Sequence, residues 1–284
     1  MATRREIHQI LASTPTIEGA GVHLQRVFGY PEVPQFDPFL LLDDFHSDNP
    51  EDYQAGFPWH PHRGIETVTY MLHGKVRHED SIGNRGVIQR GDMQWMTAGS
   101  GIIHQEMPEQ DDGVLWGLQL WVNLPASHKM MPPRYQEIAD AHIPEISLQD
   151  NVTVRVLCGT VGDVQGPVRG IVVDPEYLDV TVPADTTFEH PISQGYTAFA
   201  YVLEGHGYFD HARQHLIPPE HLVLFTDGDH VQITTEADSV RFLLISGKPL
   251  KEPVAWYGPI VMNTNEELQQ AFEEYRNGTF IQSH

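Results

Sequence analysis

Short runs of alternating apolar and polar residues dominate the chain. They are rich in Val, Ile, Thr, Tyr and Leu, and Gly or Pro separates them; examples are RGIETVTYMLHG, GVLWGLQLWVNLP, VTVRVLCGTVG and YTAFAYVLEG. Alternation with a period of two places successive side chains on opposite faces of a strand. Many short strands with turns between them predict an all-β protein built from sandwiches or barrels.

A helical period occurs mainly near the C-terminus, in NTNEELQQAFEEYRNGTF. Asn263 or Thr264 can cap the start of this helix, and Gly278 can end it. Its apolar face consists of Leu268, Ala271, Phe272 and Tyr275. We therefore expect one short C-terminal helix beside the strands.

The second half of the chain repeats features of the first. Aligning Gly74 with Gly205 lays ETVTYMLHG over TAFAYVLEG, an offset of 131 residues. Aligning Gly99 with Gly228 lays TAGSGIIHQE over TDGDHVQITT, an offset of 129 residues. Nearly equal offsets indicate a duplicated unit. We expect two tandem antiparallel β-barrels, one in residues 1–135 and one in residues 136–284.

Candidate chemistry lies in two short motifs, His60-x-His62 and His104-x-Glu106. Residues i and i+2 of a strand share a face, so each pair can point at one place. A bare H-x-H is also compatible with two solvated or hydrogen-bonded histidines in a loop. Two antiparallel strands with both pairs pointing inward would supply three imidazoles and a carboxylate. Such donors suit Fe, Mn, Co, Ni, Cu or Zn better than Mg or Ca.

The alignment gives the second barrel no equivalent set of donors. The four residues that take the places of the motif residues are Pro191, Ser193, Ile233 and Thr235. Two of these side chains are wholly apolar, and the set offers no good ligands. We therefore expect residues 136–284 to form a degenerate barrel that binds no metal.

Composition excludes some classes of function. Lys and Arg total 17 against 39 Asp and Glu, a net charge of −22, which repels phosphate backbones and argues against direct nucleic-acid binding. Cys158 has no second cysteine to pair with, and its neighbours VTVRVLCGT predict a buried strand position. No apolar run approaches the length of a membrane span. We expect a cytoplasmic monomer.

The two motifs resemble those of the pirin family. The matching stretches are HPHRGIETVTY and GDMQWMTAGSGIIHQEMP, and FDPFLLLDDF, LWVNLP and MNTNEELQQAFEEYRNGTF are similar as well. The resemblance covers nearly the whole chain and implies the bicupin fold of the cupin superfamily. It also implies a metal held by the two histidines of the first motif and the histidine and glutamate of the second. In this sequence these are His60, His62, His104 and Glu106.

A second glutamate, Glu66, occupies the place that many cupins use for a ligand inside the first motif. Pirins resemble one another in using the later glutamate, so we expect Glu106 to bind the metal. Glu66 is then a candidate to accept the remaining N–H of a ligating imidazole.

Several neighbours of the motifs have two interpretations. Arg63 could steer an anionic substrate or form a surface salt bridge, and His73 and His78, which flank a turn, are expected to be solvated. Three tryptophans could wall a pocket or pack in the core: Trp59, Trp95 and Trp116.

The resemblance implies two leading functions. Some bacterial pirins resemble quercetin 2,3-dioxygenases, which cleave a flavonol with O₂ and release carbon monoxide and a depside. In that case Glu106 would be the general base that takes the 3-hydroxyl proton, and one divalent metal, expected to be Fe(II), would be needed. Mn, Ni, Co, Cu or Zn could replace it.

Other pirins resemble iron-dependent, redox-sensing regulators that bind a protein partner, either a transcription factor or a metabolic enzyme. Another cupin activity, such as an isomerase, is a third alternative with the same ligands.

Overall fold

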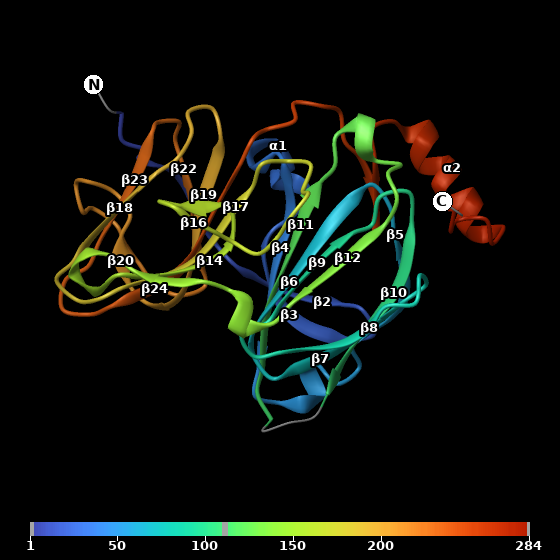
Figure 1. Cartoon of the computed structure of the whole chain (residues 1–284), viewed down its shortest axis with the longest axis horizontal. Helices are drawn as coiled ribbons and strands as arrows, with labels where there is room; N and C mark the ends of the chain where they lie inside the picture. Colours follow the sequence, from blue (N-terminus) through green and yellow to red (C-terminus); the bar gives the residue numbers. More distant parts are fainter. Residues whose placement is uncertain (1–2, 110–112, 283–284) are drawn as a thin grey trace. The chain divides into compact units, whose positions relative to one another are not determined.

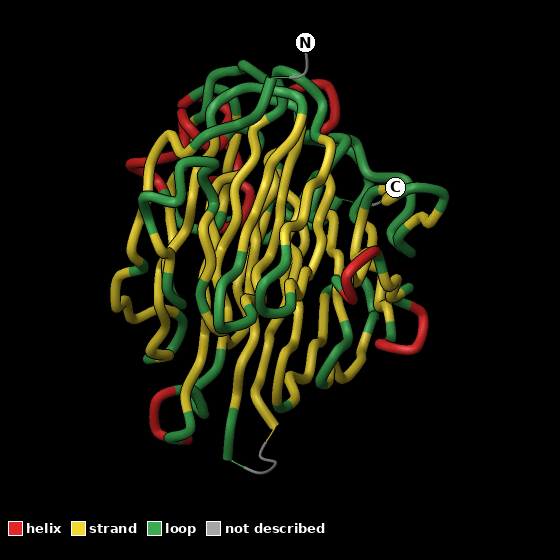
Figure 2. The backbone as a smooth tube through the Cα atoms, turned by 90° about the vertical axis from the view of Figure 1, so that its left-hand side faces the viewer, coloured by secondary structure: helices red, strands yellow, loops and turns green. Residues whose placement is uncertain are grey.

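The computed structural model describes residues 3–109 and 113–282. Strands make up most of the chain, and the helical segments are short (Figure 2). Contacts between residues divide the chain into two units. The first, which we call the N-unit, contains Thr14–Val33, Pro38–Asp140 and Leu250–His284. The second, the C-unit, contains Met1–Ser13, Pro34–Asp37 and Ala141–Pro249.

These units differ from the expected division into residues 1–135 and 136–284 at both ends of the chain. The main boundary, between Asp140 and Ala141, lies close to the expected one. The N-terminal strand, however, pairs within the C-unit, and the last segment packs within the N-unit. Sequence alternation cannot show this exchange, because a strand's own pattern does not name the sheet that it joins.

The N-unit contains a seven-stranded and a four-stranded antiparallel sheet (Figure 1). In sheet order, the seven strands are β12 (Arg134–Ile138), β9 (Met93–Thr97), β6 (Ile65–His73), β11 (Leu115–Asn123), β4 (Phe39–Ser47), β3 (Val22–Phe28) and β2 (Thr14–Glu18). The four strands are β5 (Phe57–His62), β10 (Ile102–Glu109), β7 (Lys75–Asp80) and β8 (Arg85–Gln89). Phe45 and Met71 of the larger sheet pack with Val76 and Ile88 of the smaller one to form a shared core.

The C-unit has the same two-sheet construction. In sheet order, its seven strands are β1 (Ile7–Ala12), β22 (His221–Phe225), β19 (Thr197–Gly205), β24 (Val240–Gly247), β17 (Glu176–Val182), β14 (Thr153–Cys158) and β13 (Glu145–Ser147). Its four strands are β18 (Thr187–Pro191), β23 (His230–Thr234), β20 (Gly207–Tyr208) and β21 (Leu216–Ile217). Phe188 and Val231 pack with Val180 and Phe242 across the two sheets. Cys158 is buried on β14, as the sequence predicts.

The remaining elements are short. Two small hairpins consist of β15 (Thr160–Val161) with β16 (Val164–Gln165), and β25 (Ala255–Tyr257) with β26 (Ile260–Met262). The single-turn helices are α1 (Val33–Phe36), η1 (Tyr30–Glu32), η2 (Pro50–Asp52), η3 (Ala126–His128), η4 (Asp140–His142) and η5 (Gln149–Asn151). The C-terminal helix α2 (Asn265–Arg276) starts at the predicted cap, since Thr264 accepts a hydrogen bond from the Glu267 N–H. Its Ala271 packs in one cluster with Ile260 of β26.

The strand order confirms the predicted duplication. Reading both large sheets from the same edge, β9-β6-β11-β4-β3-β2 corresponds to β22-β19-β24-β17-β14-β13, and β5-β10-β7-β8 corresponds to β18-β23-β20-β21. Gly74 and Gly205 occupy equivalent turns of the two units, with φ of 77° and 68°. A Cβ at Gly74 would lie 2.7 Å from the Val114 carbonyl oxygen, and a Cβ at Gly205 would lie 1.9 Å from the Ser239 carbonyl oxygen. The aligned glycines therefore meet the same local requirement.

Strand pairing corrects one part of the alignment. His104 lies opposite His60 and Ile102 opposite His62, whereas Ile233 lies opposite Phe188 and Val231 opposite His190. The C-unit positions that match the first motif are therefore Phe188 and His190, and the expected Pro191 and Ser193 are wrong. The cause is the connection to the next strand, which has two residues (63–64) in the N-unit and five (192–196) in the C-unit.

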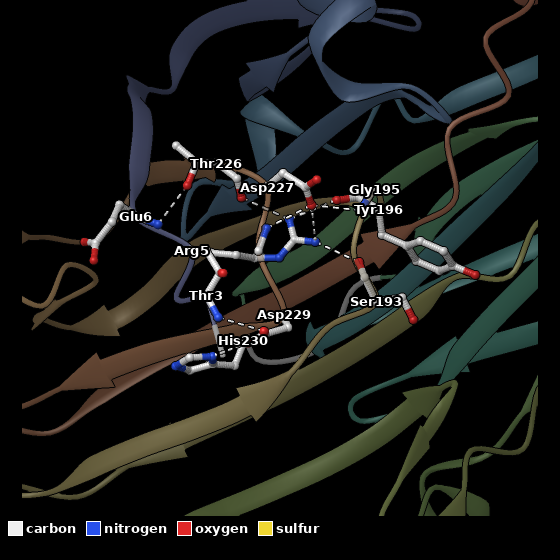
Figure 3. A network of polar contacts seen from close by, with 11 residues as sticks. Thr3, Arg5, Glu6, Ser193, Gly195, Tyr196, Thr226, Asp227, Asp229 and His230 are labelled. Carbon is white, nitrogen blue, oxygen red and sulfur yellow. Dashed lines mark hydrogen bonds and ion pairs between the residues drawn. The ribbon is translucent and has the colours of Figure 1, made fainter. Parts of the chain in front are cut away.

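Arg5 anchors the N-terminal segment within the C-unit (Figure 3). Its side chain is 1% exposed. The guanidinium donates to the carbonyl oxygens of Tyr196 at 2.9 Å, Thr226 at 3.0 Å and Ser193 at 2.8 Å. One buried cation thus satisfies three main-chain acceptors beside the edge to which β1 adds.

We predict that Arg5→Ala lowers the free energy of unfolding by about 3 kcal/mol, because three carbonyl oxygens lose a charged donor. Urea unfolding followed by circular dichroism measures the change. Arg213→Ala in the same unit is the matched control, since Arg213 is exposed and its nitrogen lies 3.9 Å from Glu236. An unfolding midpoint for Arg5→Ala that equals the control would contradict the anchoring role.

Candidate metal centre

The two histidine motifs lie on paired strands of the N-unit. β10 runs antiparallel to β5, with His104 opposite His60 and Ile102 opposite His62. The pairing is irregular between His104 and Glu106, as in a β-bulge. A bulge redirects the side chains beyond it, so Glu106 is not a simple continuation of the His104 face.

Three imidazoles converge at this pairing. Each of His60, His62 and His104 offers a ring nitrogen, and these nitrogens all lie within 4.8 Å of one another. The ring centroids of His60 and His104 are 4.3 Å apart, and those of His62 and His104 are 5.0 Å apart. The predicted same-face placement of the first pair therefore brings both of its rings to the second motif.

Backbone carbonyls determine which nitrogen of His60 and His62 carries the proton. His60 Nδ1 lies 2.8 Å from the Pro58 oxygen, and His62 Nδ1 lies 3.1 Å from the Pro259 oxygen. A carbonyl only accepts, so each neutral ring donates from Nδ1 and keeps its lone pair on Nε2. Both Nε2 atoms are then free to bind a cation.

Those two lone pairs face each other, with His60 Nε2 and His62 Nε2 3.1 Å apart. Two acceptors cannot form a hydrogen bond, but both can bind one cation. Nitrogens bound to the same ion at about 2.1 Å each lie roughly 3.0 to 3.4 Å apart at ordinary bond angles. The observed separation fits that arrangement.

His104 provides a second test of fit. The side chain is fully buried, and its Nε2 has no hydrogen-bond partner among the described residues. Burying an unpaired polar nitrogen is costly. A metal ion bound to this nitrogen would remove the cost. The residues present therefore fit the metal ion that the sequence motifs imply.

Glu106 lies beside His104 in a second, overlapping group. Its Oε1 accepts from Thr69 Oγ1 at 3.1 Å, and its Oε2 accepts from Gln119 Nε2 at 3.0 Å. Glu106 shares a candidate metal group with His104 and His78, whereas His60 and His62 share the other group with His104. His104 therefore connects the four predicted ligands.

His78 is a residue of the candidate site that sequence reasoning missed, and the expectation that it is solvated is wrong. The side chain is 0% exposed and contacts both Asp80 and His104. The available signal was the alternation in KVRHED, where Val76, His78 and Asp80 are the buried positions of β7. Polar residues at those positions obscured the inward face.

Glu66 has another partner. It is fully buried on β6, and its Oε1 accepts from Thr97 Oγ1 at 2.7 Å. Neither candidate metal group in the described part of the chain includes it. Burial raises the pKa of the Glu66 carboxyl group.

Burial sets the charge of the imidazoles. It lowers the pKa of His62 and His104 well below the usual value, and the neighbouring imidazoles lower it further. It also lowers the pKa of His60. Neutral imidazole is the form that binds metals, so the site holds its histidines ready at neutral pH.

A cavity of about 590 Å³ opens on His60 and His62. Its lining is mainly apolar, with Leu41, Phe57, Pro58, Trp121, Trp256 and Pro259, and it includes Arg26, Asp43, Glu18 and Gln119. Gln119 also donates to Glu106, which joins the cavity wall to the carboxylate. Volume and lining are those of a small-molecule site.

The tryptophans of the wall are not the expected ones. Trp121 and Trp256 line the cavity, whereas Trp95 is fully buried in the core and Trp59 is 49% exposed. Trp116 donates to Asp44 at 3.0 Å. Strand position within the sheet, which sequence does not give, decides which indole reaches the site.

Two family models match this chain. The pirin model matches residues 21–122, and the model of the pirin C-terminal cupin domain matches residues 177–281. A pirin-like protein of Caulobacter vibrioides is 47% identical over 97% of this chain and 99% of its own length. The chain belongs to the pirin family.

Other relatives of this pirin family member carry an activity in their names. A Pseudomonas aeruginosa protein named "Putative quercetin 2,3-dioxygenase" is 44% identical over 98% of this chain and 99% of its own length. The crystal structure of quercetin 2,3-dioxygenase from Acinetobacter baumannii matches with a TM-score of 0.89 and 31% identity, over 98% of this chain and 99% of that one. The predicted resemblance and the bicupin fold are confirmed. The helices in the described ranges are all too short or too polar to cross a membrane.

Arg63 of this pirin family member is buried, and its guanidinium is engaged by partners within the chain. It is 2% exposed, and its guanidinium bonds Glu274 Oε2 at 2.7 Å and the carbonyl oxygens of Ser100 at 2.6 Å and Phe280 at 2.9 Å. The guanidinium carbon also lies 4.2 Å from the centre of the Phe280 ring. Arg63 thus fixes the C-terminal segment directly beside His62.

Lys129 holds the same region from the other side. The buried ammonium donates to the carbonyl oxygens of Gly64 at 2.9 Å and Val261 at 3.0 Å, and to Asn123 Oδ1 at 2.7 Å. Burial lowers the pKa of Lys129 to about 7, although Glu252 and Glu267 oppose the shift. These bonds tie the connection after His62 to the segment that carries Pro259.

We predict that metal content depends on His62 and His104 but not on His73. His62→Ala and His104→Ala should each remove most of the bound metal, measured by elemental analysis of the purified protein, because each loses a converging imidazole. His73→Ala is the control, since His73 lies on β6 outside both candidate groups. Full metal occupancy in His62→Ala would exclude that residue as a ligand.

A pH-dependent stability is predicted from Lys129. Its folded pKa of about 7 is lower than the unfolded value of about 10.4, so the unfolded chain binds the extra proton between these values. Stability should rise with pH in this window, by at most about 1.4 kcal/mol per pH unit, relative to Lys129→Met. Urea unfolding followed by tryptophan fluorescence measures this in the N-unit, where all 5 tryptophans lie. A constant difference between the two proteins from pH 7 to 10 would refute the shift.

Proposed function

We propose that this pirin family member is a metal-dependent dioxygenase that cleaves quercetin or a related flavonol with O₂. The observation that carries the proposal is the convergence of three imidazoles, two of which, His60 and His62, line an apolar cavity of about 590 Å³. Glu106 lies in the overlapping group that shares His104. The activity named for its Pseudomonas and Acinetobacter relatives supports the same reaction class.

The metal would be held by His60, His62, His104 and Glu106. Three imidazole nitrogens and a carboxylate oxygen suit Fe(II), which we propose as the native metal, and also accept Mn, Ni, Co, Cu or Zn. A bound ion supplies Lewis acidity toward a substrate hydroxyl group and redox chemistry with O₂.

The cavity walls would bind and orient the flavonol. Phe57, Trp121 and Trp256 offer flat apolar surfaces to a planar aromatic ring. Arg26 is held by Asp43 through two hydrogen bonds of 2.8 Å, and both side chains line the cavity. This pair supplies donors and acceptors for ring hydroxyl groups, while the aromatic walls exclude water.

Glu106 would act as the general base. Thr69 and Gln119 each donate to one of its oxygens, which fixes the carboxylate and leaves a further lone pair on each oxygen. One of these takes the proton of the flavonol 3-hydroxyl group. Both atoms of O₂ then enter the products, one ring carbon leaves as carbon monoxide, and the remainder is a depside.

Glu106→Gln should reduce quercetin turnover by about 10²-fold or more while part of the metal stays bound, because an amide keeps an oxygen donor but cannot take the proton. Loss of flavonol absorption in air measures turnover, and elemental analysis measures the metal. Glu109→Gln is the control, since Glu109 lies at the end of the same strand and its side chain is 36% exposed.

Three outcomes separate the roles. Equal loss of metal and activity in Glu106→Gln would show a ligand role alone. Unchanged turnover would exclude Glu106 as the base. If the wild-type protein is fully loaded with Fe(II) or Mn and quercetin survives in air, the dioxygenase proposal fails for this substrate, and the redox-sensing regulator becomes the hypothesis to test.

A further inference from the structure

A buried chain of three polar side chains leads to the candidate metal centre from the side of β7. Asp80 Oδ2 lies 3.3 Å from His78 Nε2, and His78 Nδ1 lies 3.4 Å from His104 Nδ1. His78 and His104 are fully buried, and neither side chain of the Asp80–His78 pair is exposed to solvent. The chain is therefore isolated from water, and its protons can be assigned by counting donors and acceptors.

Asp80 acts as a hydrogen-bond acceptor at both of its carboxylate oxygens. Its Oδ1 accepts from the N–H groups of Ile82 at 3.0 Å and Asn84 at 2.9 Å, and its Oδ2 accepts from Asn84 Nδ2 at 2.8 Å. A carboxylate that receives these donors accepts the His78 Nε2 proton as well. His78 must therefore donate from Nε2.

The donor role of His78 Nε2 also determines where the ring protons of His78 and His104 lie. A neutral imidazole that donates from Nε2 carries its lone pair on Nδ1. His78 Nδ1 can then accept only if His104 donates from its own Nδ1, across the 3.4 Å that separates them. His104 is left with its lone pair on Nε2, the buried nitrogen without a partner among the described residues.

This count also decides between the two roles open to His78. The residue shares a candidate metal group with His104 and Glu106, so it could be a ligand. Both of its nitrogens, however, are engaged, one by Asp80 and one by His104. Tyr135 stacks on its ring at 4.8 Å and fixes its plane. His78 is thus held in place to orient another side chain.

We infer that Asp80 and His78 form a positioning pair that fixes the tautomer of His104 and aims its Nε2 at the metal. The inference rests on the metal site of the proposed function but not on its substrate. It also distinguishes the three histidines. His60 and His62 are held by backbone carbonyls, which no side-chain substitution removes, whereas His104 is held by two replaceable side chains. Hydrogen-bonded partners of this kind raise the basicity of a ligating imidazole.

The test measures Co(II) affinity by competition with a chelator, together with the visible absorption spectrum of the Co(II) protein. His78→Leu should weaken Co(II) binding by about 10- to 100-fold and change the spectrum, because His104 loses the acceptor that fixes its tautomer. His78→Gln should restore most of the affinity, since its amide oxygen can accept from His104 and its amide nitrogen can donate to Asp80.

Two further variants complete the design. Asp80→Asn should give an intermediate loss, because an amide can donate to His78 and thereby release its tautomer. Asn84→Ala is the control for the turn alone, since Asn84 bonds Asp80 but not His78. Its Co(II) affinity should stay within threefold of the wild type, and thermal unfolding of every variant checks that the barrel is intact.

Several results would overturn the inference. Wild-type Co(II) affinity and spectrum in His78→Leu would remove the positioning role. Complete loss of metal in both His78→Leu and His78→Gln, equal to that in His104→Ala, would make His78 a ligand. A wild-type protein that binds no Co(II) would overturn the metal site and this inference together. Failure to cleave quercetin would leave the affinity measurements, and hence the inference, standing.

Discussion

A buried imidazole has two ring nitrogens, and each must find a partner when water is removed. At His60, His62 and His104 this constraint is met on one side of the ring and left open on the other. His60 and His62 donate to backbone carbonyls, and His104 faces His78. What remains is a set of lone pairs that point inward to one place. The other features of the site surround these lone pairs. The cavity opens on His60 and His62, and Glu106 lies beside His104. Arg63 and Lys129 hold the segments next to His62 in place.

The C-unit shows that the fold does not require these residues. Its strands follow the same order, yet the positions of His60 and His104 are taken by Phe188 and Ile233, which pack in the core cluster. Only the position of His62 keeps a histidine, His190, and its Nε2 lies 2.8 Å from Glu176. In the C-unit, apolar side chains pack at the positions where the N-unit has imidazoles with lone pairs directed inward. Such a division is typical of a site built on a scaffold that can fold without it.

Sequence reasoning could predict the features that depend on local pattern. Alternation predicted the strands, the cap predicted the start of the helix, and the His60-x-His62 motif predicted two imidazoles on one face. The second motif predicted His104 at the same place, but the bulge before Glu106 could not be foreseen. It could not predict features that depend on register or on distant partners. Three added residues between β18 and β19 shifted the alignment, and the neighbours of His78 became visible only when β7 was placed beside β10. The buried role of Arg63 likewise depends on Glu274 and Phe280, more than two hundred residues away.

The exchange of the chain ends also has a consequence for the order of synthesis. His62 receives its carbonyl partner from Pro259, 197 residues later in the chain. A ribosome therefore releases both histidine motifs long before the residue that fixes the His62 tautomer exists. The N-unit includes residues that follow the C-unit in the chain, whereas the C-unit includes strand β1, which precedes the N-unit. A metal that needs the finished geometry of His62 would therefore bind only after the segment that carries Pro259 has been made and packs beside the strands made earlier.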